Sequence, residues 1–162
     1  MGGIVGPTPW WQSNLAAACP EGSNLPDGSI IICKSGGTAW IVAPGCTQVN
    51  GPPWGNYATE GNTVQGDLPQ ITPTIWPALY NRLVSCGFNP NDWFVPSISQ
   101  LQNPGRVCCN KWYTSSKCFW SSTEVNSAVA RSLRLDAGAQ DTCKCRQDAG
   151  AFSVRAFRCV TY

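Results

Sequence analysis

The sequence predicts one α+β domain that is rich in loops and stapled by disulfides. Only 12% of its 162 residues are charged, and 16 glycines and 13 prolines are spread along the chain, a composition typical of loop-rich α+β or β folds. The hydrophobic share of 43%, with eight tryptophans, is enough for one core. The ten cysteines are an even number far above cytosolic usage, which indicates disulfides and an oxidising destination.

Residues 1–26 show neither helical nor strand periodicity, and we interpret them as an N-terminal arm ahead of a domain at 27–162. The arm carries the adjacent pair Trp10 and Trp11. It is either a plain flexible arm or one whose two indoles dock on a neighbouring subunit, since exposed indoles are costly on a monomer. The docking hypothesis predicts that the chain is part of an oligomer or larger assembly.

A hairpin and a long loop follow the arm. The β-branched runs 29–33 and 38–43 are joined by Lys34-Ser-Gly-Gly37, which is a hairpin signal. Residues 44–72 are rich in turn formers, so we expect a long ordered loop there, either a ligand loop or a cover for the core.

Two helices and three strands complete the prediction. The first helix spans 74–86, and Gly87 is the residue that stops it. Its apolar residues at helical spacing are Ile75, Leu79, Leu83 and Cys86. A shorter helix begins at Ser97 and ends before Pro104-Gly105. The segments 119–123, 128–135 and 153–160 have strand character.

The charge distribution is uneven and bears on partners. Residues 106–162 hold nine bases against four acids, while residues 1–105 hold two bases against five acids. This excess suits an acidic glycan or an anionic cell surface. The chain has no run of Lys and Arg and no RNA-binding signature, so nucleic acid is not an expected partner.

The sequence carries few signs of catalysis or of bound cofactors. Histidine is absent, which removes the commonest general base. Nothing in the spacing of the candidate carboxylates selects an acid–base pair; these are Asp67, Asp92, Glu124 and Asp136. Cys108-Cys109 and Cys143-Lys-Cys145 lack the knuckle spacing of zinc sites, which favours disulfides. We therefore expect no enzyme activity, no metal and no cofactor.

The N-terminus offers no export signal. The first cation is Lys34, and the longest apolar piece, 15–19, is too short for a signal-peptide core. No segment approaches the roughly 20 apolar residues of a membrane span. A disulfide-rich chain without an export signal has three explanations. It is released by cell lysis, as a phage structural protein is; or its leader has been removed; or it is a cytosolic protein whose thiols stay reduced.

The second half of the chain carries a recognisable series of motifs. They are Cys86-Gly-Phe88, Asp92-Trp-Phe-Val-Pro-Ser97 followed by Leu101, Phe119-Trp-Ser-Ser-Thr-Glu124, and Ser153-Val-Arg-Ala-Phe-Arg-Cys-Val160. The series resembles the bacterial and phage domain family typified by the C-terminal domain of the Lcl collagen-like adhesin. The chain departs from the family pattern at Phe94-Val95, where the family has Arg-Leu, and at Gln100, where it has Glu.

The resemblance covers about 27–162 and implies a C-type-lectin-like fold. In that fold the N- and C-terminal strands pair, two helices flank the sheet, and long loops bind partners. The resemblance places the helix carrying Cys86 against the final strand carrying Cys159, and so implies a disulfide between them. The hallmark residues are interpreted mainly as scaffold, with Trp93 and Trp120 as core aromatics. The triplets of calcium-dependent lectins are missing.

The expected function is that of a virion-associated phage protein, a capsid decoration or tail-fibre component that contacts other virion proteins or a host-surface glycan. A secreted adhesin domain that binds acidic polysaccharide is one alternative, and an enzyme of the formylglycine-generating-enzyme fold is another. Aromatic and hydrogen-bonding side chains mix in the loops as sugar sites require. The candidate ligand face comprises Lys111, Trp112, Tyr113, Asn126, Gln140 and Arg146.

Overall fold

The computed structural model describes residues 10–52, 54, 75–106, 111–113, 118–124, 130–136, 139–141 and 152–162. The helical elements in this part are α1 (Trp10–Ala18), η1 (Gly45–Thr47), α2 (Ile75–Ser85), η2 (Pro90–Asp92), α3 (Ile98–Gln100) and η3 (Leu101–Arg106). The strands are β1 (Ile30–Ser35), β2 (Thr38–Val42), β3 (Val49–Asn50), β4 (Cys118–Glu124), β5 (Ala130–Arg134), β6 (Ala139–Asp141), β7 (Phe152–Val154) and β8 (Phe157–Thr161). The predicted α+β class is confirmed.

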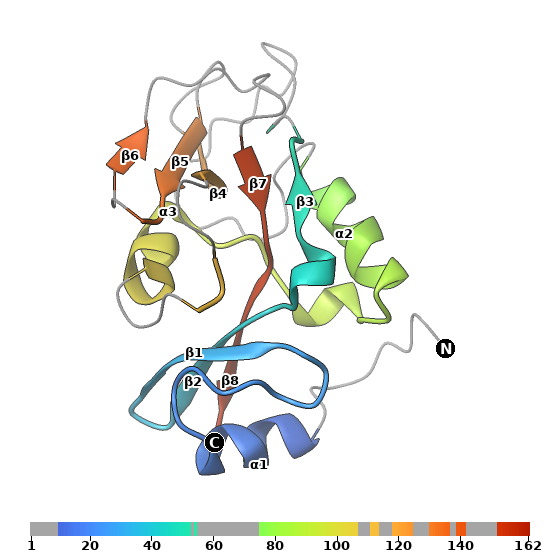
Figure 1. Cartoon of the computed structure of the whole chain (residues 1–162), viewed down its shortest axis with the longest axis vertical. Coiled ribbons are helices and arrows are strands. Elements are labelled where there is room, and N and C mark those ends of the chain that lie inside the picture. The colour runs from blue at the N-terminus through green and yellow to red at the C-terminus, as the bar shows by residue number, and fades with distance from the viewer. Residues whose placement is uncertain are drawn as a thin grey trace.

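The strands form two sheets that share the C-terminal segment. A three-stranded antiparallel sheet has the order β1-β2-β8, and a five-stranded mixed sheet has the order β3-β7-β4-β5-β6. The strand predicted over 153–160 is divided, because Arg155 and Ala156 lie between β7 and β8. Figure 1 shows this red segment running along the long axis of the molecule, from one sheet into the other.

The predicted hairpin is confirmed, and its turn is glycine-dependent. Gly36 and Gly37 have φ values of 57° and 81°, the left-handed conformation that a two-residue hairpin turn of type I′ requires at both positions. β2 then pairs with β8, so that Trp40 lies opposite Cys159.

The structure differs from the predicted arm over residues 10–26. Trp10–Ala18 form α1, which packs against β8 at the end of the molecule (Figure 1). Ala16 is fully buried in the core, and Lys34 Nζ donates to the carbonyls of Ala17 and Cys19 at 3.0 and 2.8 Å, at the negative end of the helix. The contact surface of α1 is built partly from alanine, which gives no apolar stripe that periodicity would detect.

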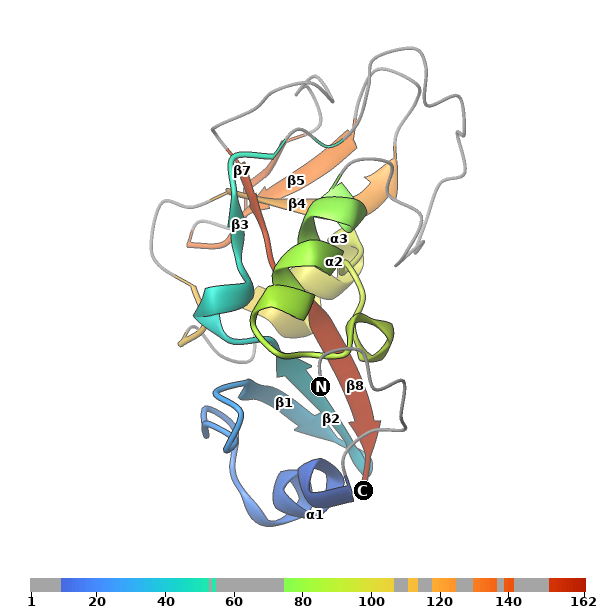
Figure 2. The same ribbon diagram turned by 90° about the vertical axis from the view of Figure 1, so that its right-hand side faces the viewer.

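Helix α2 confirms the predicted helix, and Gly87 forms the stop that follows it, as expected. The Gly87 N–H donates to the carbonyl of Val84 at 3.0 Å, and the Phe88 N–H donates to that of Leu83 at 2.9 Å. These two bonds, with φ of +87° at Gly87, make a Schellman motif. Ile75, Leu79 and Leu83 are buried, and Figure 2 shows α2 lying in front of the passage from β7 to β8.

The second helix also begins where the sequence predicts. The Ser97 Oγ accepts from the Gln100 N–H at 3.1 Å, and the Gln100 side chain accepts from the Ser97 N–H at 2.9 Å, which is a capping box. The chain continues through η3, whose regular helical backbone is interrupted at Asn103, just before Pro104.

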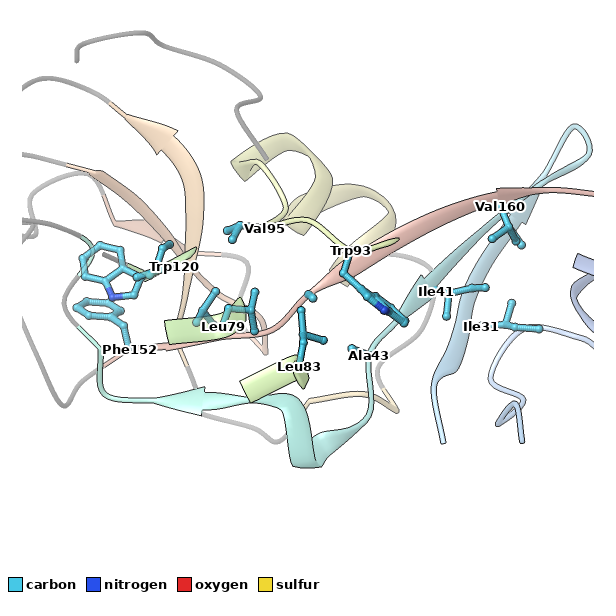
Figure 3. Packing of buried hydrophobic residues seen from close by; sticks show 14 of the residues in the cluster. Ile31, Ile41, Ala43, Leu79, Leu83, Trp93, Val95, Trp120, Phe152 and Val160 are labelled. Atoms are coloured by element: carbon cyan, nitrogen blue, oxygen red, sulfur yellow. The ribbon is translucent and has the colours of Figure 1, made fainter. Parts of the chain in front are cut away.

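The core holds most of the tryptophans that can be described. Trp93 and Trp120 are 1% and 0% exposed, so their prediction as core aromatics is confirmed. Figure 3 shows Trp120 beside Phe152, with 4.4 Å between ring centroids, and Leu79 and Leu83 between this pair and Trp93. A second cluster lies across the β2–β8 sheet and contains Trp112, Phe119 and Phe157 among others.

Candidate functional site

Trp112 does not belong to a ligand face, which corrects the sequence prediction. Its side chain is 2% exposed, and its indole Nε1 donates to the carbonyl of Gly105 at 2.7 Å. Its ring meets those of Phe119 and Phe157 edge-on, with centroids 5.2 and 5.3 Å apart. The local pattern Lys-Trp-Tyr in a loop does not tell whether the Trp side chain is exposed on the surface or buried in the core.

The other ligand-face candidates are only partly described. Lys111 is exposed and lies over Gly22, while Tyr113 is half-buried against the Trp112 ring. Gln140 stands in β6 opposite Leu133, and its side chain lies outside the described residues. Asn126 and Arg146 lie outside them altogether.

The assembly-arm candidates begin α1. Trp10 and Trp11 are the first two residues of this helix, and their side chains lie outside the described part of the chain. The docking hypothesis for these indoles therefore stays a prediction.

The Trp-Ser-Ser-Thr-Glu motif fastens β4 to the start of α3. The Ser122 N–H donates to the carbonyl of Pro96 at 2.8 Å, and Thr123 Oγ1 accepts from the Ile98 N–H at 3.0 Å. Ser121 Oγ donates across to the carbonyl of Arg131 at 2.8 Å. The side-chain oxygens of Ser121 and Thr123 thus bond the protein's own backbone, and the Ser122 Oγ is buried without a hydrogen-bond partner. The motif is therefore scaffold at these positions.

Arg155 is a buried cation between the two sheets. Its Nε donates to the carbonyl of Ala43 at 2.6 Å, its Nη1 donates to the carbonyl of Trp112, and the guanidinium stands 5.9 Å from the centre of the Trp112 ring. Burial lowers the pKa of Arg155 to about 10, which leaves the group protonated at neutral pH. A surface-charge count from sequence includes this residue wrongly.

Arg158 is the second buried cation. It is 4% exposed, its Nη1 lies 3.7 Å from Asp92 Oδ2, and its guanidinium stands 5.7 Å from the Trp93 ring centre. Burial lowers the pKa of Arg158, while the charges of Asp92 and Asp27 oppose that shift. Burial likewise raises the pKa of Asp92. The motif residues Asp92 and Arg158 therefore form an internal ion pair.

Two cysteines lie together near Arg155. The Cys86 Sγ donates to the carbonyl of Cys46 at 3.0 Å. Burial is the main cause that raises the pKa of the Cys46 thiol, with Cys86 adding to it and the charge of Arg155 opposing it. Sequence reasoning missed this cluster because its members are far apart in the chain and no local pattern connects them.

The predicted Cys86–Cys159 disulfide is not formed, and both residues are free thiols. Val160 lies in the same core cluster as Leu83 of α2. Because successive residues of a strand point to opposite faces, Cys159 points away from the side on which α2 lies. Cys86, at the end of α2, contacts η1 instead of β8.

Comparison of the chain with models of protein families, with curated proteins and with solved structures finds no match. None of the helices in the described ranges is long and apolar enough to cross a membrane. Within the same ranges, no group of three or more acidic or thiol side chains is placed to hold a metal ion.

Proposed function

We propose that this chain is a non-enzymatic, virion-associated phage binding protein, a capsid decoration or tail-fibre component built on a C-type-lectin-like scaffold. The observation that carries the proposal is that the most specific motif, Trp-Ser-Ser-Thr-Glu, forms its hydrogen bonds within the chain. The side chains of Ser121 and Thr123 and the backbone N–H of Ser122 bond backbone groups of the same chain. Recognition of a capsid neighbour or host glycan is then left to the segments between the motifs.

The course of the chain supports the lectin-like scaffold. β8 returns to pair with β2 along its whole length and so joins the sheet that contains the first strand, β1. This arrangement is close to the pairing of N- and C-terminal strands that the resemblance implies. Phe94, in the Asp-Trp-Phe-Val-Pro-Ser motif, exchanges two backbone hydrogen bonds with Phe157, at 3.0 and 2.9 Å. The motifs that suggest the family are therefore in contact with each other.

The charge of the C-terminal part gives weaker support to the adhesin alternative than the sequence suggests. Two of its nine bases, Arg155 and Arg158, are buried, and Arg134 pairs with Asp136 at 2.8 Å. Charges that are buried or already paired within the protein contribute little to the attraction of an acidic polysaccharide. The alternative rests on the exposed Lys111, on the half-buried Arg106 and Arg131, and on bases outside the described ranges.

The localisation is tested by immunogold microscopy of virions purified from the strain that carries the gene, using antibody against the whole protein. We expect gold at one repeated position on the particle. A virion fraction free of the protein, with the protein in the culture medium, would overturn the virion assignment and favour a secreted adhesin.

Binding is tested on an array of neutral and acidic glycans and on immobilised virion proteins. We expect one class of partner to be retained by the wild type and lost in Lys111→Ala or Tyr113→Ala, with Arg82→Ala as an exposed control on α2. Hydrolysis or chemical change of any array component would contradict the non-enzymatic assignment.

A further inference from the structure

Two thiols from distant parts of the sequence meet between η1 and the end of α2, and the buried Arg155 bonds the carbonyl of Ala43 just before η1. Cys46 is the middle residue of η1, Cys86 directly follows α2, and Arg155 joins β7 to β8. In Figure 1 the short cyan helix before β3 lies beside α2, which is the contact that brings the two cysteines together. Neither thiol belongs to the candidate ligand face.

Both cysteine backbones are held in place by the protein. The Cys86 N–H donates to the carbonyl of Arg82 at 3.1 Å, which continues the helix, and the next residue is the Gly87 of the Schellman motif. On the other side, the Thr47 N–H donates to the carbonyl of Pro44 at 3.0 Å, and the Thr47 hydroxyl donates to the same carbonyl at 2.6 Å. The thiols are therefore kept adjacent without a covalent bond.

We propose that Cys46 and Cys86 are a dithiol site that closes to a disulfide by exchange with a small disulfide such as oxidised glutathione. The contact that carries the proposal is the 3.0 Å bond from Cys86 Sγ to the Cys46 carbonyl. This inference does not depend on the proposed function.

The exchange has two steps, and its atoms and electrons balance. The Cys46 thiol loses a proton, and its thiolate attacks one sulfur of oxidised glutathione, forming a mixed disulfide and releasing one glutathione thiolate. The Cys86 thiolate then attacks the Cys46 sulfur, closes the protein disulfide and releases the second glutathione. The protein loses two electrons and two protons, and one oxidised glutathione becomes two reduced molecules.

Exposure assigns the two roles. Cys46 is exposed, so a small disulfide reaches it first, whereas Cys86 is only partly exposed and lies against Cys46. Burial raises the pKa of Cys46, and the charge of Arg155 only partly offsets this rise, so accessibility decides the roles. Cys46 is therefore the attacking thiol and Cys86 the resolving thiol.

The chain offers an unambiguous peptide map for the test. Trypsin cleavage after Lys34, Arg82 and Arg106 gives one fragment, 35–82, whose only cysteine is Cys46, and one, 83–106, whose only cysteine is Cys86. Cleavage after Arg158 isolates Cys159 in the last four residues. Purified full-length protein is equilibrated with reduced and oxidised glutathione, alkylated, digested without reduction and analysed by mass spectrometry.

We expect fragment 35–82 joined to fragment 83–106. The cross-link should raise the midpoint of thermal unfolding by about 10 °C, and the rise should disappear on reduction. The variant Cys86→Ser should keep glutathione on Cys46 because it lacks the resolving thiol. The control Cys159→Ser should form the same cross-link as the wild type.

Three results would overturn the proposal. They are fragment 83–106 joined to the C-terminal fragment, as the sequence predicted; both fragments alkylated at every glutathione ratio; and a Cys86→Ser protein that carries no glutathione at Cys46. Each is read from the mass spectrum, and the first two come from the wild type, so a variant that fails to fold does not affect them.

Discussion

Arg158 Nη1 and Asp92 Oδ2 face each other across 3.7 Å, with the Arg158 side chain 5% exposed and that of Asp92 18% exposed. The guanidinium is incompletely satisfied, since its Nη2 is buried without a hydrogen-bond partner. Transferring two charged groups out of water costs more free energy than their attraction at this separation recovers, unless further hydrogen bonds compensate. The pair therefore joins two motifs of the chain without adding net stability.

The double variant Asp92→Asn/Arg158→Met tests this conclusion. Methionine keeps much of the arginine stem over Trp93 and removes the orphan nitrogen, so we expect the free energy of unfolding to stay within about 1 kcal/mol of the wild type or to rise. Urea unfolding followed by tryptophan fluorescence gives the value. A loss of more than about 3 kcal/mol would show that the ion pair stabilises the fold after all.

The pH dependence of stability provides a second test of Asp92. Burial raises its pKa above the ordinary 3.8, although Arg158 acts in the opposite direction. The folded protein thus binds this proton more tightly than the unfolded chain, and the resulting stability is present below about pH 3.8 and is lost as pH rises through the folded pKa. Relative to Asp92→Asn, the wild type should become less stable between pH 3.5 and about pH 6.

Urea titrations of both proteins across that range measure the difference. A difference that instead grows in favour of the wild type with rising pH would mean that attraction to Arg158 outweighs burial. The exposed pair Arg134–Asp136, with 2.8 Å between Nε and Oδ1, supplies the control. Asp136→Asn should show a much smaller pH effect because solvent screens an exposed pair.

Thr123→Val tests the interpretation of the Trp-Ser-Ser-Thr-Glu motif as scaffold. The substitution keeps the shape of the side chain but removes the oxygen that accepts the Ile98 N–H at 3.0 Å. Leaving this part-buried donor without a partner should cost about 1–2 kcal/mol of unfolding free energy. Thr161→Val, at an exposed position of β8, should change stability by less than about 0.5 kcal/mol. Equal effects of the two substitutions would reject the scaffold role of Thr123.

The parts of the fold that the sequence predicts well are those specified by neighbouring residues. Gly36 and Gly37 alone select the hairpin turn, and Leu79, Leu83 and Gly87 specify the buried face and the end of α2. Each of these residues determines the conformation of the chain only a few positions away. The structure changes little about them apart from moving element ends by a residue or two.

The parts that the sequence predicts poorly depend on contacts between distant segments. Arg155 belongs by sequence to a basic surface, and only its bonds to Ala43 and Trp112 reveal that it is buried. Cys86 was assigned to Cys159 from the resemblance, yet it meets Cys46, which is 40 positions earlier. Periodicity does not predict helix α1, because Ala16, which is fully buried, differs little in hydrophobicity from its exposed alanine neighbours.

The pH dependence of glutathione capture by Cys46 shows which of two opposing influences controls the thiol. Burial raises its pKa above 9.0 and Cys86 adds to this, while the charge of Arg155 acts against both. In Cys86→Ser the burial remains, so the thiolate should stay a minor species at neutral pH. The rate of mixed-disulfide formation should then rise about tenfold per pH unit from pH 6 to pH 8.

Quenched reactions, scored by mass spectrometry of fragment 35–82, measure that rate. A rate that levels off near pH 7 would mean that the guanidinium of Arg155 holds the thiol largely ionised, so that the buried cation dominates the reactivity of Cys46. A rate that keeps rising means that desolvation dominates. In that case Arg155 serves mainly to join the two sheets through Ala43 and Trp112, and capture is fast only where the surrounding pH is alkaline.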